Sequence, residues 1–163
     1  MKYALIGCGR IGVNHLRAAL RNGLEIAAVC DVLPQKMELL LSRFHLEKKE
    51  SIARYTDYQE MMESISPQLV AIATPSGSHG EIALHCIGQG ANVLIEKPIA
   101  LCLSQAREIV RLAEEKKVKA AVCHQNRFNL PVQKLRQAVE AGRLGRLSHG
   151  TVHVRWHRDE NYY

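Results

Sequence analysis

A glycine pattern at the end of an apolar run constrains this chain more than any other feature. Gly7-Cys8-Gly9-Arg10-Ile11-Gly12 follows the apolar run Tyr3–Ile6 and precedes residues whose apolar side chains recur at helical spacing. A G-x-G-x-x-G pattern is weak alone, but between a strand and a helix it is typical of a turn that binds a dinucleotide. Gly7 permits the tight turn, Gly9 leaves room for a diphosphate, and Gly12 lets the helix pack closely on the strand. We therefore assign Gly7, Gly9, Arg10, Ile11 and Gly12 to a predicted cofactor site.

Short apolar runs alternate with helical patterns along the first three-quarters of the chain. The expected strands are Lys2–Ile6, Leu24–Cys30, Ile52–Tyr55, Gln68–Thr74, Asn92–Glu96 and Val118–Cys123. This alternation predicts a parallel sheet with crossover helices, that is, an α/β, doubly wound Rossmann sheet of about six strands over residues 1–123. Between the third and fourth strands, Thr56 and Gln59 have the spacing of a capping box and predict the start of a helix.

The pattern changes after residue 123. Pro131 is expected to begin a helix, and Leu147–His157 then alternates strictly between apolar and polar residues. Such alternation predicts a half-buried strand. Residues 124–163 therefore read as the first helix and strand of a second α/β domain, which would be incomplete. A bare apolar strand is liable to pair with another copy, so we expect a homo-oligomer formed through it, or a disordered tail.

Asp31 lies at the end of the second expected strand, close to the spacing that the glycine pattern requires. A carboxylate there accepts hydrogen bonds from ribose hydroxyls and repels a 2′-phosphate, which favours NAD over NADP. Lys36 is the nearest cation and would soften this preference. The alternative is a turn aspartate that caps the helix beginning at Pro34.

Composition argues against several classes of protein. The formal net charge is +6, but the basic residues are scattered and often neighbour acids, and aromatic residues make up only 5%. We therefore expect a solvated surface; a nucleic-acid binder is the weaker alternative, and strongly salt-dependent DNA binding would be needed to support it. No apolar run is long enough to span a bilayer. The five cysteines show no Cys-x-x-Cys spacing, and no signal peptide precedes the first strand, so a reducing, cytoplasmic location is expected.

Four motifs follow one another in a characteristic order. The glycine turn is followed by Ala73-Thr74-Pro75-Ser76-Gly77-Ser78-His79, by Glu96-Lys97-Pro98 and by Gln125-Asn126-Arg127-Phe128. Together they resemble the Gfo/Idh/MocA oxidoreductases, and the resemblance covers essentially the whole chain. It implies hydride transfer between NAD and a hydroxyl-bearing carbon of a sugar, nucleotide-sugar or cyclitol. The alternative is an NAD(H)-binding module without catalytic activity of its own.

The same resemblance implies roles for individual residues. Lys97 would lie near the nicotinamide and the reacting carbon as the catalytic residue, and Glu96 would orient the motif or contact the cofactor ribose. Thr74, Pro75 and Gln125 would follow strand ends that face the cofactor. His79 has two readings, as a ligand contact or as a helix-cap residue.

The end of the chain adds a hint of a subgroup. Val154-Arg155-Trp156-His157-Arg158 and Tyr162-Tyr163 resemble members that act on nucleotide-linked sugars, including UDP-N-acetylglucosaminuronate 3-dehydrogenases. His149, His153 and His157 would share one strand face, but every fourth residue of an extended strand lies too far apart for one metal ion. We therefore expect no metal site, with a zinc site at these histidines as a remote alternative.

Overall fold

The computed structural model describes residues 1–157 and 159–160. The chain divides into two compact units, Met1–His124 and Gln125–Tyr163, which are described separately. No helix in the described part of the chain is both long and apolar enough to cross a membrane.

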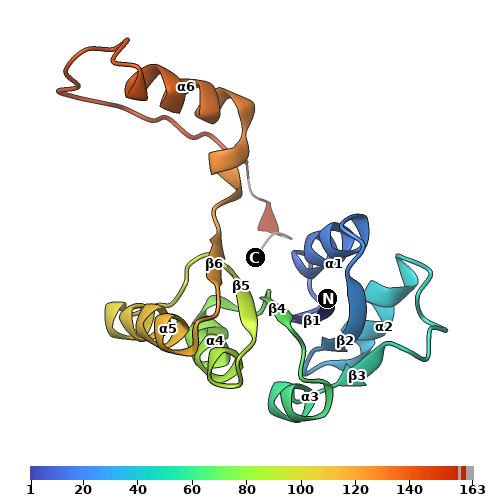
Figure 1. The fold of residues 1–163 in the computed structure, drawn as a ribbon. Helices are drawn as coiled ribbons and strands as arrows, with labels where there is room; N and C mark the ends of the chain where they lie inside the picture. Colours follow the sequence, from blue (N-terminus) through green and yellow to red (C-terminus); the bar gives the residue numbers. More distant parts are fainter. Residues whose placement is uncertain (158, 161–163) are drawn as a thin grey trace. The chain divides into compact units, whose positions relative to one another are not determined.

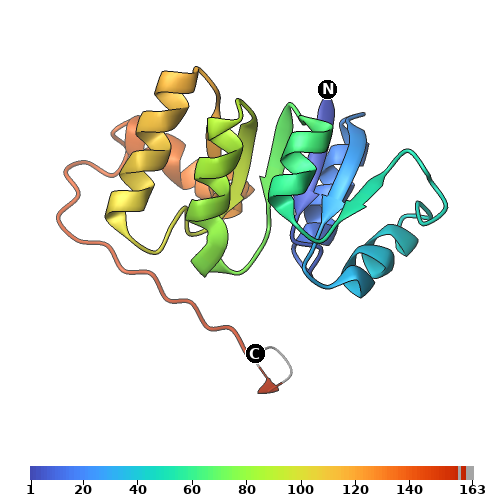
Figure 2. The ribbon, with the colours of Figure 1, turned by 90° about the horizontal axis from the view of Figure 1, so that it is seen from below.

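The first unit is built on a parallel sheet of six strands (Figures 1 and 2). The strand order is β3-β2-β1-β4-β5-β6, which confirms the predicted doubly wound Rossmann sheet. The strands are β1 (Lys2–Ile6), β2 (Glu25–Cys30), β3 (Ala53–Tyr55), β4 (Leu69–Ile72), β5 (Asn92–Glu96) and β6 (Ala120–Cys123). Because every pair is parallel, the carboxyl ends of all six strands meet at one edge of the sheet.

Five helices cover the two faces of this sheet. They are α1 (Gly12–Arg21), α2 (Pro34–Ser42), α3 (Tyr58–Ile65), α4 (His79–Gly88) and α5 (Leu103–Lys116), and a short 3-10 turn, η1 (Ser76–Ser78), precedes α4. One buried cluster joins α1 and α2 to the sheet through residues such as Leu16 and Leu40. A second cluster joins α3, α4 and α5 to the opposite face through Met61, Ile87 and Ile109. Burial on both faces explains why the strands are continuous apolar runs.

Helix α3 begins one residue later than its capping pattern predicted. Asp57 is the N-cap, and its Oδ1 accepts hydrogen bonds from the backbone N–H of Gln59 at 2.6 Å and of Glu60 at 3.2 Å. The predicted capping role of Thr56 is therefore wrong. An aspartate caps at least as well as a threonine, so the adjacent carboxylate takes the position.

In the described residues of the second unit, a 3-10 turn, η2 (Gln125–Phe128), is followed by helix α6 (Leu130–Glu140). The helix expected from Pro131 is thus present, but the strand expected over Leu147–His157 is not formed. A strand needs a neighbouring edge for its backbone hydrogen bonds, and within the described residues none pairs with this segment. Arg158, Tyr162 and Tyr163 of the subgroup pattern lie outside the described residues.

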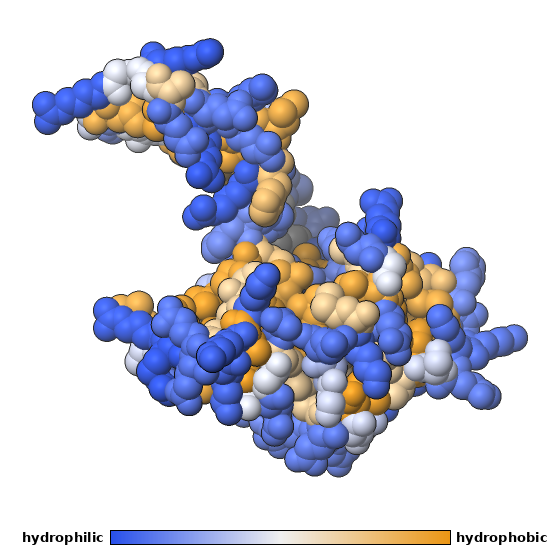
Figure 3. Space-filling model, viewed as in Figure 1, coloured by the Kyte–Doolittle hydropathy of each residue, from blue (hydrophilic) through white to orange (hydrophobic). Residues whose placement is uncertain are grey.

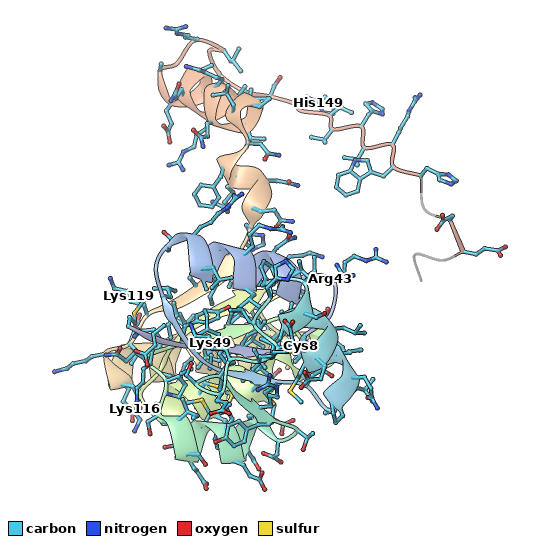
Figure 4. All side chains as sticks on the ribbon, turned by 90° about the vertical axis from the view of Figure 1, so that its right-hand side faces the viewer. Cys8, Arg43, Lys49, Lys116, Lys119 and His149 are labelled. Atoms are coloured by element: carbon cyan, nitrogen blue, oxygen red, sulfur yellow. The ribbon has the colours of Figure 1, made fainter. Side chains whose placement is uncertain are left out.

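Apolar side chains lie on the surface of the second unit (orange in Figure 3). Val152 is 85% exposed and Trp156 is 67% exposed. Basic side chains, by contrast, are spread over the first unit: Lys49 follows α2, Lys116 ends α5 and Lys119 precedes β6 (Figure 4). This spread is the scattered basic surface that the composition suggested.

Candidate cofactor-binding site

Three strand ends and the turns after them are tied together at the carboxyl edge of the sheet. The N–H of Gly7, after β1, donates to the Cys30 carbonyl at 2.8 Å, and the N–H of Ala73, after β4, donates to the Ile6 carbonyl at 2.8 Å. A cavity of about 480 Å³ opens between these turns, a volume typical of small-molecule sites. The lining residues come from the last residues of β1 and β2, the turns after β1, β2, β3 and β4, and the first turns of α2, α3 and α4: Ile6, Gly7, Gly9, Arg10, Ile11, Cys30, Asp31, Val32, Lys36, Thr56, Tyr58, Ala73, Thr74, Pro75, Ser78, Glu81 and Ile82.

The three glycines of the motif occupy three different environments. Gly7 has φ of +95°, and a Cβ there would lie 2.5 Å from the backbone of Ala73. A Cβ on Gly12 would lie 2.5 Å from the Gly7 carbonyl oxygen, so Gly12 lets α1 approach the turn although it does not line the cavity. Gly9 lines the cavity, and nothing lies within 4 Å of the position its Cβ would take. The space at Gly9 suits a diphosphate at the N-terminus of α1.

Asp31 links the glycine turn to the end of β2. Its Oδ2 accepts the N–H of Cys8 at 2.8 Å, and its Oδ1 accepts the N–H of Leu33 at 3.0 Å. Asp31 thus forms a turn directly before α2, whose N-cap is Leu33, and binds the N–H of the N-cap residue itself. The alternative of a turn aspartate is therefore right about the turn and wrong about the helix cap. The carboxylate lines the cavity and is held by two backbone donors, which leaves lone pairs for ribose hydroxyls.

Two buried thiols beside the cavity stay neutral. Burial, and then the Asp31 carboxylate, raise the pKa of Cys8 to about 12. Burial, followed by Asp57 and Asp31, raises the pKa of Cys30 to about 12. Neither adds a negative charge to a site that would hold a diphosphate.

The structure brings several unpredicted residues to the cavity. Thr56 and Tyr58 arrive from the turn after β3 and the start of α3, and Ser78 and Glu81 from the start of α4. Ser78 belongs to the motif Ala73–His79 at the end of the fourth expected strand. No sequence pattern indicated Thr56, Tyr58 or Glu81 as site residues. Lys36, foreseen only as the nearest cation to Asp31, also lines the cavity.

His79 is buried beneath the site, at 1% exposure, and does not line the cavity. Its Nε2 lies 2.8 Å from the Thr74 carbonyl oxygen and its Nδ1 lies 2.7 Å from the Pro98 carbonyl oxygen. It therefore joins the turn after β4 to the turn after β5. Both ring nitrogens face backbone groups, so the geometry supports a structural bridge between two predicted site segments.

Glu96 and Lys97 lie at the carboxyl end of β5, outside the cavity lining. The Glu96 side chain is 15% exposed, and its Oε1 lies 3.0 Å from His15 Nε2 of α1. Lys97 is exposed. His15, Glu96 and Cys123 form one group, within the described residues, whose ligand-type atoms lie within 4.8 Å of one another. Gln125 belongs to the second unit, whereas every residue that lines the cavity belongs to the first unit.

The donor set of the cavity fits a dinucleotide. The N-terminus of α1 offers backbone N–H groups, Gly9 leaves space beside them, and Asp31 supplies a carboxylate at the neighbouring strand end. Apolar walls from Ile6, Ile11 and Ile82 suit a planar base.

Comparisons with known proteins agree with this geometry. Residues 1–124 match the family model GFO_IDH_MocA, described as an oxidoreductase family with an NAD-binding Rossmann fold. The rhizopine catabolism protein MocA of Rhizobium meliloti is 34% identical over 147 residues, which is 90% of this chain and 44% of that protein. The D-glucoside 3-dehydrogenase of Escherichia coli strain K12 is 32% identical, over 90% of this chain and 41% of that protein.

Among solved structures, the chain is similar to the WlbA dehydrogenase from Chromobacterium violaceum in complex with NADH and UDP-GlcNAcA. That likeness has a TM-score of 0.90 at 31% identity and covers 100% of this chain and 46% of the other. The chain thus spans less than half the length of the relatives it matches.

Proposed function

Since this chain belongs to the Gfo/Idh/MocA oxidoreductase family, whose NAD-binding Rossmann domain matches residues 1–124, we propose that its cavity binds NAD(H). The observation that carries the proposal is the cavity itself, with Gly9 open beneath it and Asp31 held at the end of β2 by the glycine turn. We assign the cofactor contacts to Gly7, Gly9, Arg10, Ile11, Asp31, Thr74 and Pro75. Gly12 and His79 are assigned to positioning the turns that carry these residues. Glu96, Lys97 and Gln125 are assigned to the nicotinamide end.

We propose further that the whole protein is an NAD-dependent dehydrogenase. When bound, NAD accepts or returns a hydride at its nicotinamide ring. Oxidation of a hydroxyl-bearing carbon also releases the hydroxyl proton, and Lys97 Nζ is the group that would take it. The substrate class is a sugar, nucleotide-sugar or cyclitol; the likeness to a WlbA dehydrogenase in complex with UDP-GlcNAcA favours the nucleotide-sugar.

Calorimetric titration with NADH and, separately, with NADPH tests the cofactor proposal. We expect micromolar NADH binding and NADPH binding at least about tenfold weaker, because Asp31 repels a 2′-phosphate. Asp31→Ser should reduce this ratio, with Lys36 then able to face the phosphate. Equal affinities in the unsubstituted chain would contradict the preference, and binding of neither cofactor would contradict the proposal.

Lys97→Ala tests the catalytic assignment. We expect it to keep NADH affinity and to lose turnover of a nucleotide-sugar or cyclitol that the unsubstituted protein oxidises. If the unsubstituted chain binds NADH but reduces NAD with none of these substrates, the chain acts as an NAD(H)-binding module.

We also propose that residues 1–123 and 124–163 are separate domains, that Leu147–His157 mediates association between copies, and that the protein is cytoplasmic. The exposed Val152 and Val154 side chains support association, and five unpaired cysteines support a reducing compartment. Light scattering tests the association: Val152→Asp with Val154→Asp should convert an oligomer to a monomer. A monomeric unsubstituted chain would contradict it.

A further inference from the structure

The Glu96 carboxylate has neighbouring groups from three places in the first unit. His15 Nε2 of α1 faces Oε1 at 3.0 Å, and since a carboxylate only accepts, the ring donates from Nε2. The backbone N–H of Lys97 donates to Oε2 at 3.3 Å. The Cys123 Sγ, at the end of β6, lies within 4.8 Å of the His15 and Glu96 side-chain atoms. The carboxylate therefore lies between a helix and two neighbouring strand ends.

This arrangement connects the glycine turn with the lysine that follows Glu96. Helix α1 begins at Gly12, directly after the turn that lines the cavity, and His15 lies in its first turn. The His15 side chain is 7% exposed, so its bond to Glu96 is largely shielded from water. Charge-assisted hydrogen bonds are strong when they are shielded. If His15 moved, Glu96 Oε1 would lose its hydrogen bond. The Glu96 side chain could then rotate, and its contact with the Lys97 backbone would change.

We propose that His15 is a positioning residue for Lys97 and acts through Glu96, with Cys123 beside the same carboxylate. His15 touches neither substrate nor cofactor in this assignment. The inference rests on the proposed function only for the role of Lys97; the positioning itself is a property of the protein without ligand.

The same three side chains could instead hold a zinc ion, because histidine, glutamate and cysteine are all zinc ligands. One observation favours the hydrogen-bonded arrangement. The His15–Glu96 distance of 3.0 Å is that of a direct hydrogen bond.

The test follows the Lys97 side chain by NMR. The lysines of the full chain are dimethylated with ¹³C, and the Lys97 signal is identified by its absence in Lys97→Arg. We expect His15→Ala to shift and broaden this signal, and His15→Gln to restore it, because a glutamine amide offers a donor near the position of Nε2. His85→Ala is the matched control: it removes a histidine of α4, on the other face of the sheet, and should leave the Lys97 signal unchanged.

Two results would overturn the proposal. One is an unchanged Lys97 signal in a folded His15→Ala protein. The other is zinc binding at one ion per chain that is lost in both His15→Ala and Cys123→Ser. If His15→Ala does not fold, His15→Asn replaces it, since asparagine is too short to reach Glu96.

NADH separates this inference from the proposed function. Addition of NADH to the unsubstituted chain should move the Lys97 signal if Lys97 lies beside the nicotinamide. If NADH binds, as measured by its fluorescence, and the signal does not move, the role proposed for Lys97 fails, while the comparison of His15 variants without ligand still decides the positioning.

Discussion

Substitutions of single glycines in the motif after β1 allow cofactor binding and stability to be tested separately. Gly9 has open space where its Cβ would lie, so Gly9→Ala should fold normally, but its methyl group would occupy the space assigned to the diphosphate. We expect an NADH dissociation constant raised by at least about tenfold and a melting temperature within about 2 °C of the unsubstituted chain. Calorimetric titration and thermal unfolding measure both.

Gly12→Ala is the matched substitution, and we expect it to lower stability, which Gly9→Ala should leave unchanged. Its Cβ would meet the Gly7 carbonyl oxygen at 2.5 Å, and backbone there cannot move aside cheaply. We expect a loss of about 1–3 kcal/mol in the free energy of unfolding, as for other overpacked sites. Equal stability of the two alanine variants would contradict the distinct roles given to the two glycines.

Cysteine reactivity should follow the local environment of each thiol. Hydrogen bonds from the Ser104 hydroxyl and the Gln105 backbone lower the pKa of the exposed Cys102, so a larger fraction is thiolate at pH 7. Burial raises the pKa of Cys86 to about 12, as for Cys8 and Cys30, and these thiols stay protonated until strongly alkaline pH. We expect iodoacetamide at pH 7 to modify Cys102 first, as measured by peptide mass. Cys102→Ser should abolish the fast phase, and equally fast labelling of Cys123 would contradict the assignment.

At the residue scale, sequence reasoning was most specific where a residue type has few uses, and the contacts of these residues with a cofactor stay a prediction. The three glycines and Asp31 were predicted because a turn of this kind needs them in this order. His15 was missed, because its partner Glu96 lies 81 positions away and a buried histidine on a helix has many possible explanations. His79 was singled out as part of a motif, with a ligand contact or a helix cap as its two readings, and the structure shows two carbonyl partners that neither reading named.

At the scale of elements, the start of α3 tests how a single cap stabilises a short helix. Asp57 accepts two backbone N–H groups that would otherwise lack a partner within the helix. We expect Asp57→Ala to cost about 1 kcal/mol and to lower the melting temperature by about 3 °C. Thr56→Ala is the control, because Thr56 carries no cap bond; a larger loss from Thr56→Ala would restore the capping box that the sequence suggested.

Strands were predicted better than helix starts, for a physical reason. β1 and β5 have the bounds expected from their apolar runs, because both ends are marked by polar residues or turns. The strand expected over Leu147–His157 failed because alternation says which faces a strand would have, and not whether another strand is available to pair with it. The sequence pattern therefore identifies a candidate strand, and whether the strand forms depends on the presence of a hydrogen-bonding partner.

At the scale of the whole molecule, the cavity was only half predictable. Its glycine side follows from one local motif, whereas Thr56, Tyr58 and Glu81 reach it because the strand order places β3 and β4 on either side of β2 and β1. A binding site at the carboxyl edge of a doubly wound sheet is a consequence of that order. Which side chains close the cavity depends on packing that no local pattern records.

The division into two units predicts that residues 1–124 fold and bind NADH without the rest of the chain. This segment contains all six strands, both buried clusters, the cavity and the donors to Glu96. Truncation after His124 removes, among the assigned site residues, only Gln125. We expect cooperative unfolding and an NADH dissociation constant within about tenfold of that of the full chain, the effect of losing at most one hydrogen bond.

Truncation after Lys117 is the control: it removes β6 and Cys123, leaves β5 as an open edge, and should abolish cooperative unfolding. Failure of residues 1–124 to bind NADH, while the full chain binds it, would place an essential part of the site in residues 125–163.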